Sequence, residues 1–503
     1  MTRDGGAAPR SVPLHSRPSP FDSRRLRLFA AVALAFAVWA LHRPDAAGFV
    51  GDRAMFAYFS QAVARGEPLY RTTMFAYPPL GPMIGAVGVR AAEAVGAAGY
   101  FGPRVLGLVV LAATVIATAA LVQGVVGSAA WGLFAGLAVL TDERVVQFAT
   151  TGLEPKALVA LLAVLALLCV QRGRWAWAGT CAGLAASCWL QASLVGASLA
   201  AYALARPDRA RRLPALVGGG VLGGVPALAF LAVTGQLGAL IERVQQRVVV
   251  GGAIDQPALQ WFRVLRGLAR DRIVPVELLA LALLGLVLWS ARRVLRTRPD
   301  WLESPALAAL AVTTVVFLAY FACAGLRGIE GLTPADVGPV YPLLMIWAAV
   351  AAAALCGYAG RDLAPALIAY AAGVVVVQGA ASIPPASLAE DRRRVEALAA
   401  RTGSEPVFAV NAIEIHVLAG SATPTPYWTL APGRRAIMLR EEGLDCAGFG
   451  GAIAAGAHPV VVLGPYGDAE GCARALVSGL APGFDREAVG RYLVFTRRPP
   501  GST

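Results

Sequence analysis

The chain has 503 residues, of which 57% are hydrophobic and 15% charged, and 44 basic against 31 acidic residues give a net charge of +13. A soluble globular protein has about 25% charged residues, so these side chains could not cover the apolar surface of a water-soluble fold. The composition excludes a soluble enzyme, a disordered chain and a fibrous repeat, and it predicts a polytopic membrane protein whose basic residues lie in cytoplasmic loops.

The N-terminal segment is polar and basic. Residues 1–27 contain several prolines and arginines, which predicts a disordered cytoplasmic tail. The apolar run 28–41 follows, and no small-residue cleavage site comes after it. We therefore interpret this run as a retained membrane anchor rather than a removed signal peptide.

Apolar segments long enough to cross a membrane recur along the next 350 residues. A span needs about 20 residues, with a range of about 17–25. We expect 11–12 spans in all, the further candidates being 79–97, 104–123, 155–171, 174–189, 190–205, 213–234, 276–291, 304–326, 338–357 and 363–383. The run 129–140 is too short to cross at about 1.5 Å per residue, so we expect a partial or re-entrant element there.

The distribution of arginine predicts the sidedness. Arginine-rich loops at 172–174, 206–212 and 292–298 are expected on the cytoplasmic side. With this orientation, the segments expected on the outer side are 42–78, 142–154, 235–275, 327–337 and the region after 384. Within the second of these segments we interpret Asp142 and Glu143 as solvated ends of the short apolar element.

The last 120 residues have a different pattern. Helical segments are expected at 388–400 and 469–480, and strands at 406–412, 458–463 and 492–496. Strands alternating with helices predict a small α/β domain. Cys446 and Cys472 could form a disulfide if this region faces an oxidising compartment. The expected organisation is a tail (1–27), a transmembrane module (28–383) with first outer loop 42–78, and an extracytoplasmic domain (384–503).

The first outer loop holds the most informative residues. Asp52 follows directly after the apolar Gly48-Phe49-Val50, and an amphipathic helix is expected over 54–64. Tyr77-Pro78-Pro79 then opens the second span, where proline at a helix start is tolerated. This pattern predicts an acidic side chain held at the membrane surface by short helices, where a lipid-linked phosphate and a water-borne acceptor could meet.

These residues carry a resemblance to a known family. An acidic residue just after the first span, spaced tyrosines and a P-P-L run resemble the GT-C glycosyltransferases, above all the bacterial branch of protein O-mannosyltransferases and lipid A aminoarabinose transferases. The matching residues are Asp52, Tyr58, Ala62 or Ala64, Gly66, Tyr70, Tyr77, Pro78, Pro79 and Leu80. Further similarities lie at 150–185, 337–349 and 412–428. In the first of these, Glu154 stands where the family has an acidic residue in its second outer loop.

The resemblance implies a polytopic, mainly helical GT-C-like bundle that transfers a sugar from a polyprenyl-phosphate donor to an acceptor hydroxyl, with inversion. Asp52 would be the general base, and Glu154 would orient the acceptor, help position Asp52 or bind a divalent cation. The donor phosphate needs cationic or polar partners, for which the candidates are Arg53, Arg71, Tyr77, Lys156 and Arg327. Loop-shaping or acceptor contacts are expected from Tyr58, Tyr70, Pro78 and Pro79.

The same resemblance implies the partners and the location. The partners would be the lipid-linked sugar, membrane lipid and an acceptor glycan, lipid or protein, with no nucleic acid. No cofactor is expected to be obligatory and no metal site is predicted, although binding of a divalent cation stays an open alternative. The location would be the bacterial inner membrane, with a cytoplasmic N-terminus.

Other interpretations of these residues stay open. Asp52 and Glu154 could be helix-terminal residues, and Lys156 could be an interfacial side chain. A transporter or flippase for lipid-linked saccharides is one alternative function, although few ionisable residues lie in the middle of the spans. The chain also departs from many relatives at Arg53, where they have glutamate, so an inactive relative acting as an assembly partner is another.

Overall fold

The computed structural model describes most of the chain. The described residues are 37–40, 46, 48–49, 52–73, 75, 77–150, 152–251, 276–291, 300–326, 338–381, 388–402, 407–425, 429, 438–456, 458–464 and 471–499. For residues 52–53, 246–251, 276, 322, 324–326, 380–381 and 401–402, only the backbone is described. The predicted tail, most of the first span and Arg327 lie outside this set.

The predicted apolar segments are helices in the structure. They are α4 (Leu80–Ala94), α5 (Phe101–Val126), α8 (Pro155–Gln171), α9 (Trp175–Ala186), α10 (Ser193–Leu204), α11 (Arg209–Val233), α14 (Val276–Ala291), α15 (Pro305–Leu326), α16 (Tyr341–Ala359) and α17 (Ala364–Ala381). The short apolar run is α6 (Ala129–Val139), and α7 (Glu143–Thr150) follows it. The predicted class, a mainly helical bundle with a small α/β region, is confirmed.

The helices differ in their ability to cross a membrane. Among the described residues, three helical segments are long and apolar enough by length and composition, Phe101–Val126, Arg209–Val233 and Gly338–Ala359. A fourth span results if α7 and α8, which are bent sharply against each other, count as one. Helices α9 and α10 have 12 residues each, fewer than the segments 174–189 and 190–205 predicted for them. The number of 11–12 spans stays a prediction.

Small residues allow the closest helix packing in the bundle. A Cβ atom added at Gly179 of α9 would lie 1.9 Å from the carbonyl oxygen of Leu216 in α11, and one added at Gly183 would lie 2.1 Å from that of Gly220. Backbones can approach this closely only where no side chain intervenes, which is the usual device of helix pairs in membranes. Gly179 and Gly183 lie in the segment 150–185 that resembles the family, and in the structure they have a packing role.

The C-terminal region contains one four-stranded sheet in the order β1-β2-β4-β3. Strand β1 (Val407–Val410) is parallel to β2 (Val460–Leu463), whereas β4 (Tyr492–Arg497) is antiparallel to β2 and to β3 (Phe484–Val489). Helices α18 (Leu388–Thr402), α19 (Ile413–Ala419), α21 (Cys446–Ala455) and α22 (Cys472–Leu480) accompany the sheet. The predicted helices and strands of this region are present, and β3, α19 and α21 are additional.

A disulfide joins two of these helices. Cys446 and Cys472, at the starts of α21 and α22, are bonded, with Cα atoms 5.4 Å apart. Phe449, Leu476 and Phe484 pack beside the bridge in one apolar cluster with the sheet. The pairing left open by the sequence is therefore present in the structure.

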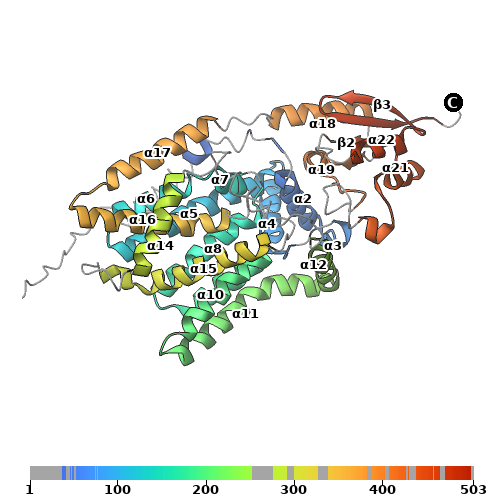
Figure 1. Ribbon diagram of the computed structural model, residues 1–503. Coiled ribbons are helices and arrows are strands. Elements are labelled where there is room, and N and C mark those ends of the chain that lie inside the picture. Colours follow the sequence, from blue (N-terminus) through green and yellow to red (C-terminus); the bar gives the residue numbers. More distant parts are fainter. Residues whose placement is uncertain are drawn as a thin grey trace, which may run out of the picture.

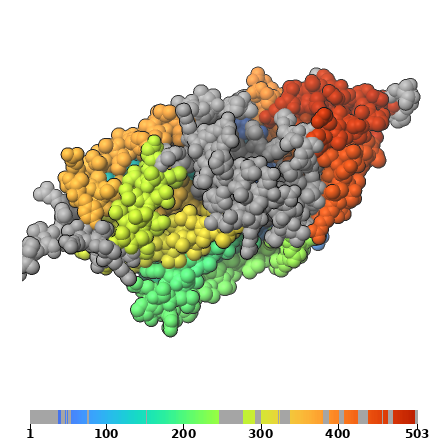
Figure 2. All heavy atoms as spheres, in the orientation of Figure 1, coloured from blue at the N-terminus to red at the C-terminus, as the bar shows by residue number. Residues whose placement is uncertain are grey.

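Helix α2 (Asp52–Arg65) and the short helices near it lie between the bundle and the C-terminal region. Figure 1 shows β2, β3, α21 and α22 of the C-terminal region at one end of the molecule. Helix α2 packs on α4 and on α19, and the short α3 (Leu69–Thr72) and α12 (Leu237–Gly251) lie nearby. In the space-filling view the C-terminal region forms that same end (Figure 2).

Helix α2 is more deeply buried than the sequence predicted. Every residue from Ala54 to Ala62 is buried, and the apolar cluster around the helix includes Leu231 of α11 and Ile413 and Val417 of α19. The helix expected over 54–64 is present, but residues on all of its faces are buried, whereas an amphipathic helix would bury one face. The physical reason is that the C-terminal region covers the face that the bundle leaves open.

Candidate functional site

Asp52 is the first residue of α2. An acidic residue in this position is stabilised by the positive end of the helix dipole, which agrees with the helix-terminal interpretation and does not conflict with a role as a base. The structure describes only the backbone of Asp52 and of Arg53. We therefore locate these two residues from the contacts of the neighbouring backbone, before them at Phe49 and after them along α2.

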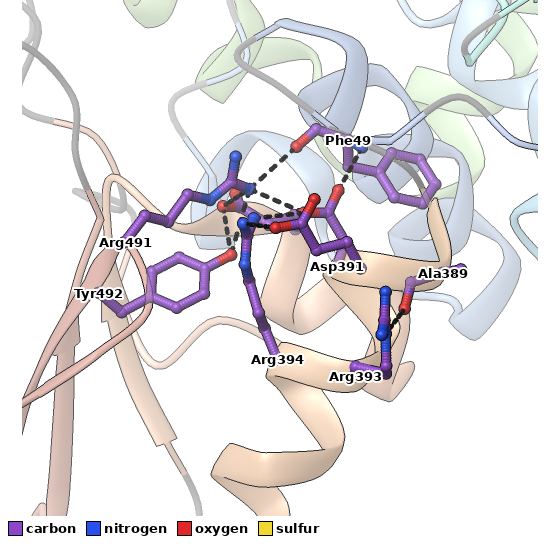
Figure 3. Close-up of polar contacts among 9 residues, drawn as sticks. Phe49, Ala389, Asp391, Arg393, Arg394, Arg491 and Tyr492 are labelled. Carbon is purple, nitrogen blue, oxygen red and sulfur yellow. Dashed lines mark hydrogen bonds and ion pairs between the residues drawn. The ribbon is translucent and has the colours of Figure 1, made fainter. Parts of the chain in front are cut away.

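Phe49 holds the backbone three residues before Asp52. Its amide N–H donates to the Oδ2 atom of Asp391 in α18 at 2.9 Å, and Arg491 donates to its carbonyl oxygen at 3.4 Å (Figure 3). The Phe49 ring packs edge-on against Tyr100, with the ring centroids 5.4 Å apart. The entry into α2 is thus held by the C-terminal region through the backbone and by the bundle through the ring.

A buried cation lies against the same ring. The guanidinium carbon of Arg104, in the first turn of α5, lies 4.4 Å from the centroid of the Phe49 ring and 5.9 Å from that of Tyr100. Arg104 is 2% exposed, and a charge this deeply buried requires compensation by other groups. Sequence reasoning missed this residue, although an arginine at the start of a 26-residue apolar helix was a usable signal.

Glu154 lies at the junction of α7 and α8. Its amide donates to the carbonyl oxygen of Phe148 at 2.9 Å, and Pro155 begins the next helix. Leu153, just before it, has a φ of 56°, a conformation that a bulky residue rarely adopts and that is common at functional sites. The glutamate makes no capping bond to the described backbone of α8, which argues against a cap as its role.

Glu154 is paired with the one lysine of the chain. The Nζ atom of Lys156 lies 3.3 Å from the Glu154 carboxylate, and both side chains are 11% exposed. Lys156 also lies over the ring of Phe148, 5.3 Å from its centroid. The pair places one negative and one positive group together at a nearly enclosed position.

The Asp52 and Glu154 segments contact the same helix. Phe49 lies against Arg104, and a Cβ atom at Gly107 of α5 would lie 1.4 Å from the carbonyl oxygen of Ala149 in α7. Residues 104 and 107 are separated by about 4.5 Å along the helix axis. The loop before Asp52 and the helix before Glu154 therefore meet at one end of α5.

A second contact brings the end of the first outer loop to Glu154. A Cβ atom at Gly81, which follows the Pro78-Pro79 pair, would lie 2.9 Å from the Cγ atom of Pro155. Pro79 is buried and Pro78 half-buried. The prolines thus direct α4 against the start of α8, so the expected loop-shaping segment adjoins the second carboxylate.

The tyrosines of the first outer loop make well-defined contacts. The Tyr70 hydroxyl donates to the carbonyl oxygen of Tyr77 at 2.7 Å, which closes the loop between them, and burial raises the pKa of Tyr70. Tyr77 packs with Phe56 at 6.0 Å between ring centroids. The Tyr58 hydroxyl accepts from the amide of Thr423 at 2.9 Å, and burial raises the pKa of Tyr58 as well.

The remaining candidates divide into those that the structure places and those it does not. Arg71 is exposed on α3, and Arg327 lies outside the described residues. Asp142 differs from its interpretation as a solvated end, because it is buried and accepts from the amide of Arg144 at 2.9 Å. Burial raises the pKa of Asp142 to about 7. Within the described part of the chain, no group of three or more histidine, cysteine, aspartate or glutamate residues could hold a metal ion.

Comparison with known proteins detects similarity in structure only. No protein-family model matches the chain, and no curated protein matches it. The crystal structure of ArnT from Cupriavidus metallidurans bound to undecaprenyl phosphate matches with a TM-score of 0.61 at 16% identity, over 95% of this chain and 99% of that one. The apo structure matches with a TM-score of 0.62 at 17% identity, over 93% and 97%. At such identities the likeness establishes the fold.

Proposed function

The chain has the fold of the GT-C superfamily of membrane glycosyltransferases, and on that premise we propose that it transfers a sugar from a polyprenyl-phosphate donor to an acceptor hydroxyl. The observation that carries the proposal is the match over nearly the whole of both chains to the crystal structure of ArnT bound to undecaprenyl phosphate. The meeting of the Asp52 and Glu154 segments at one end of α5 supports it.

The proposed reaction is a single displacement. The acceptor oxygen forms a bond to the anomeric carbon, while the bond from that carbon to the phosphate oxygen breaks and its electron pair leaves with the lipid phosphate. Asp52 accepts the proton of the acceptor hydroxyl, as a general base within hydrogen-bond reach would. Attack opposite to the leaving group inverts the configuration of the sugar.

The leaving phosphate requires positive charge. Arg104 is a candidate that the structure adds, because it is a buried cation against the loop that leads to Asp52. Lys156 is the second candidate, and its pairing with Glu154 means that the phosphate would share the lysine with that carboxylate. Arg53, Arg71, Tyr77 and Arg327 remain candidates from the sequence. Glu154 would orient the acceptor, help position Asp52 or hold a divalent cation.

The proposed location is the bacterial inner membrane, with the N-terminus inside and the region 384–503 outside. The disulfide between Cys446 and Cys472 supports this orientation, because such bonds persist in oxidising compartments. The transmembrane module 28–383 and the outer domain would then meet at the outer membrane surface. The acceptor, whether glycan, lipid or protein, would arrive from that side.

The test is a transfer assay in lipid nanodiscs with a panel of radiolabelled sugars on undecaprenyl phosphate. We expect at least one donor to lose its label to an acceptor fraction, and we expect Asp52→Asn to reduce the transfer by about 1,000-fold. Asp208→Asn is the matched control, since Asp208 is a surface residue paired with Arg212. Native mass spectrometry with undecaprenyl phosphate itself should show binding to wild type and to both variants.

Two results would contradict the proposal. The first is a wild-type protein that binds neither undecaprenyl phosphate nor any donor of the panel. The second is donor lipid that crosses the bilayer of proteoliposomes without losing its sugar, which is the outcome that a flippase predicts.

A further inference from the structure

A fully buried carboxylate of the C-terminal region controls the backbone ahead of Asp52. The Asp391 side chain has no exposed surface, and its oxygens contact three partners. These are the Phe49 amide nitrogen at 2.9 Å, the Arg491 guanidinium at 3.2 Å and the Arg394 guanidinium at 3.4 Å. Figure 3 shows Asp391 between these groups, with Phe49 on one side and the two arginines on the other.

A second buried carboxylate holds Arg491 in place. The Nη2 atom of Arg491 lies 2.8 Å from the Oε1 atom of Glu414, and the Tyr492 hydroxyl donates to the same oxygen at 2.8 Å. Burial raises the pKa of Glu414. The network therefore joins α18, α19 and the start of β4 to the backbone of Phe49.

The other half of α2 is attached to the same region. The amide group of Gln61 donates to the carbonyl oxygen of Val417 at 3.1 Å, and Arg65 donates to that of Gly420 at 3.2 Å. Tyr58 is bonded to Thr423. The helix that begins with Asp52 is thus held by the C-terminal region before its first turn and along its length.

We infer that Asp391 is a positioning residue, which fixes the Phe49 backbone and thereby the placement of Asp52, so that sugar transfer depends on the docking of the C-terminal region. This inference rests on the proposed function. Burying a carboxylate is expensive unless its oxygens are satisfied, and a charged acceptor facing a backbone N–H forms a strong bond of defined geometry. Removing that acceptor frees the loop while the apolar contacts of α2 remain.

The first test needs no substrate. Amide hydrogen exchange is measured in nanodiscs on wild type, Asp391→Ala, Asp391→Asn and Glu396→Ala, the last being an exposed glutamate of the same helix. We expect faster exchange over residues 49–58 in Asp391→Ala. The increase should be smaller in Asp391→Asn, whose amide oxygen can still accept from Phe49, and exchange in the Glu396→Ala control should equal that of the wild type. Equal exchange in all four proteins, with the C-terminal region folded, would overturn the inference.

The second test uses the donor that serves the wild-type enzyme. A displacement of about 1 Å at a reacting group can cost about 100-fold in rate, so we expect kcat in Asp391→Ala to fall by about 10- to 100-fold. The donor KM should stay near the wild-type value, and Asp391→Asn should recover most of kcat. A raised KM with unchanged kcat would overturn the positioning role.

The two proposals fail separately. Absence of transfer and of undecaprenyl phosphate binding in the wild type contradicts the proposed function but leaves the exchange result interpretable. Unchanged exchange in a working Asp391→Ala enzyme contradicts the inference alone. If Asp391→Ala does not fold, amide exchange in Asp391→Asn gives the answer, because exchange over 49–58 that is no faster than in the wild type overturns the inference.

Discussion

The Asp52 and Glu154 segments are held in contrasting ways. The Asp52 segment depends on a residue far away in the chain, because the acceptor for the Phe49 amide is Asp391, 342 positions later. The Glu154 segment depends on its neighbours, since Phe148, Pro155 and Lys156 supply its backbone bond, its helix start and its ion pair. One carboxylate is thus placed by domain docking and the other by local sequence.

The two kinds of support predict different changes in backbone mobility when contacts are removed. Weakening the C-terminal region should loosen α2 and leave α7 and α8 unaffected. Removing the Glu154 charge should act on that junction only, because its backbone bond to Phe148 and its ion pair with Lys156 are local. Amide exchange in the two segments, 49–65 and 143–171, therefore separates the two cases directly.

The largest expected effect comes from the proposed base itself. Asp52→Asn keeps the size and the helix-terminal position of the side chain but cannot accept the acceptor proton. General-base catalysis contributes about 100- to 10,000-fold, so we expect transfer to fall by about 1,000-fold in the radiolabel assay. Exchange over both segments should stay at the wild-type level, and a variant with more than half of the wild-type rate would remove Asp52 from the mechanism.

The next effect comes from the bridge between Cys446 and Cys472. The bonded residues are 26 positions apart, and closing a loop of that length stabilises the native state by about 3–4 kcal/mol. The double variant Cys446→Ser/Cys472→Ser should therefore show a less stable C-terminal region by thermal denaturation, with faster exchange over 49–65.

The pair Cys169→Ser/Cys181→Ser, in the bundle, is the matched control. Exchange over 143–171 should not change when the bridge is removed. Equal loosening of both segments would contradict the distinction between distant and local support.

Acid should weaken the same region. Burial, assisted by the charge of Arg65, lowers the pKa of His416 to about 4 from its ordinary value of 6.5. As the pH falls from about 6.5 to about 4, the unfolded chain binds a proton that the folded region excludes, so the free energy of unfolding decreases by about 3 kcal/mol.

Thermal denaturation at pH 7 and pH 4 measures this loss. His416→Gln should reduce the difference between the two pH values, whereas His458→Gln, at a half-buried position, should retain most of it. A pH dependence that is identical in wild type and His416→Gln would show that another group is responsible.

The smallest effect is expected at the local junction. Glu154→Gln removes the charge next to Lys156 but keeps the backbone bond to Phe148, so the segment should hold its conformation. We expect transfer to fall by about 10-fold, close to the value of one charge-assisted hydrogen bond, with no change in exchange over 49–65. Glu93→Gln, exposed in α4, is the control, and a faster exchange at 49–65 in Glu154→Gln would contradict the local character of this segment.

Local patterns in the sequence were sufficient for much of the fold. The apolar segments and the strands at 406–412, 458–463 and 492–496 were placed correctly, because apolar runs and alternation are visible without tertiary contacts. Strand β3 was missed, since four of its six residues are exposed and an edge strand shows little apolar alternation. The family motif led to Asp52 and Glu154.

The features that depend on distant contacts could not be predicted. Nothing near Asp391 in the sequence indicates that it bonds to Phe49, and the burial of residues 54–62 of α2 requires a covering region more than 300 residues away. Asp142 was misjudged for a similar reason, because its burial next to Tyr341 and Thr141 comes from the packing of α16. Arg104 was overlooked because a charge at a helix start usually lies in solvent.

The most direct test of the account is an experimental structure of the protein in nanodiscs with undecaprenyl phosphate bound. We predict that the phosphate lies at the end of α5 where the Asp52 and Glu154 segments meet, in contact with Arg104 or Lys156, with the Asp391–Phe49 bond intact. A phosphate bound elsewhere on the bundle, with Asp52 facing bulk water, would contradict the proposed site and with it the role of the C-terminal region.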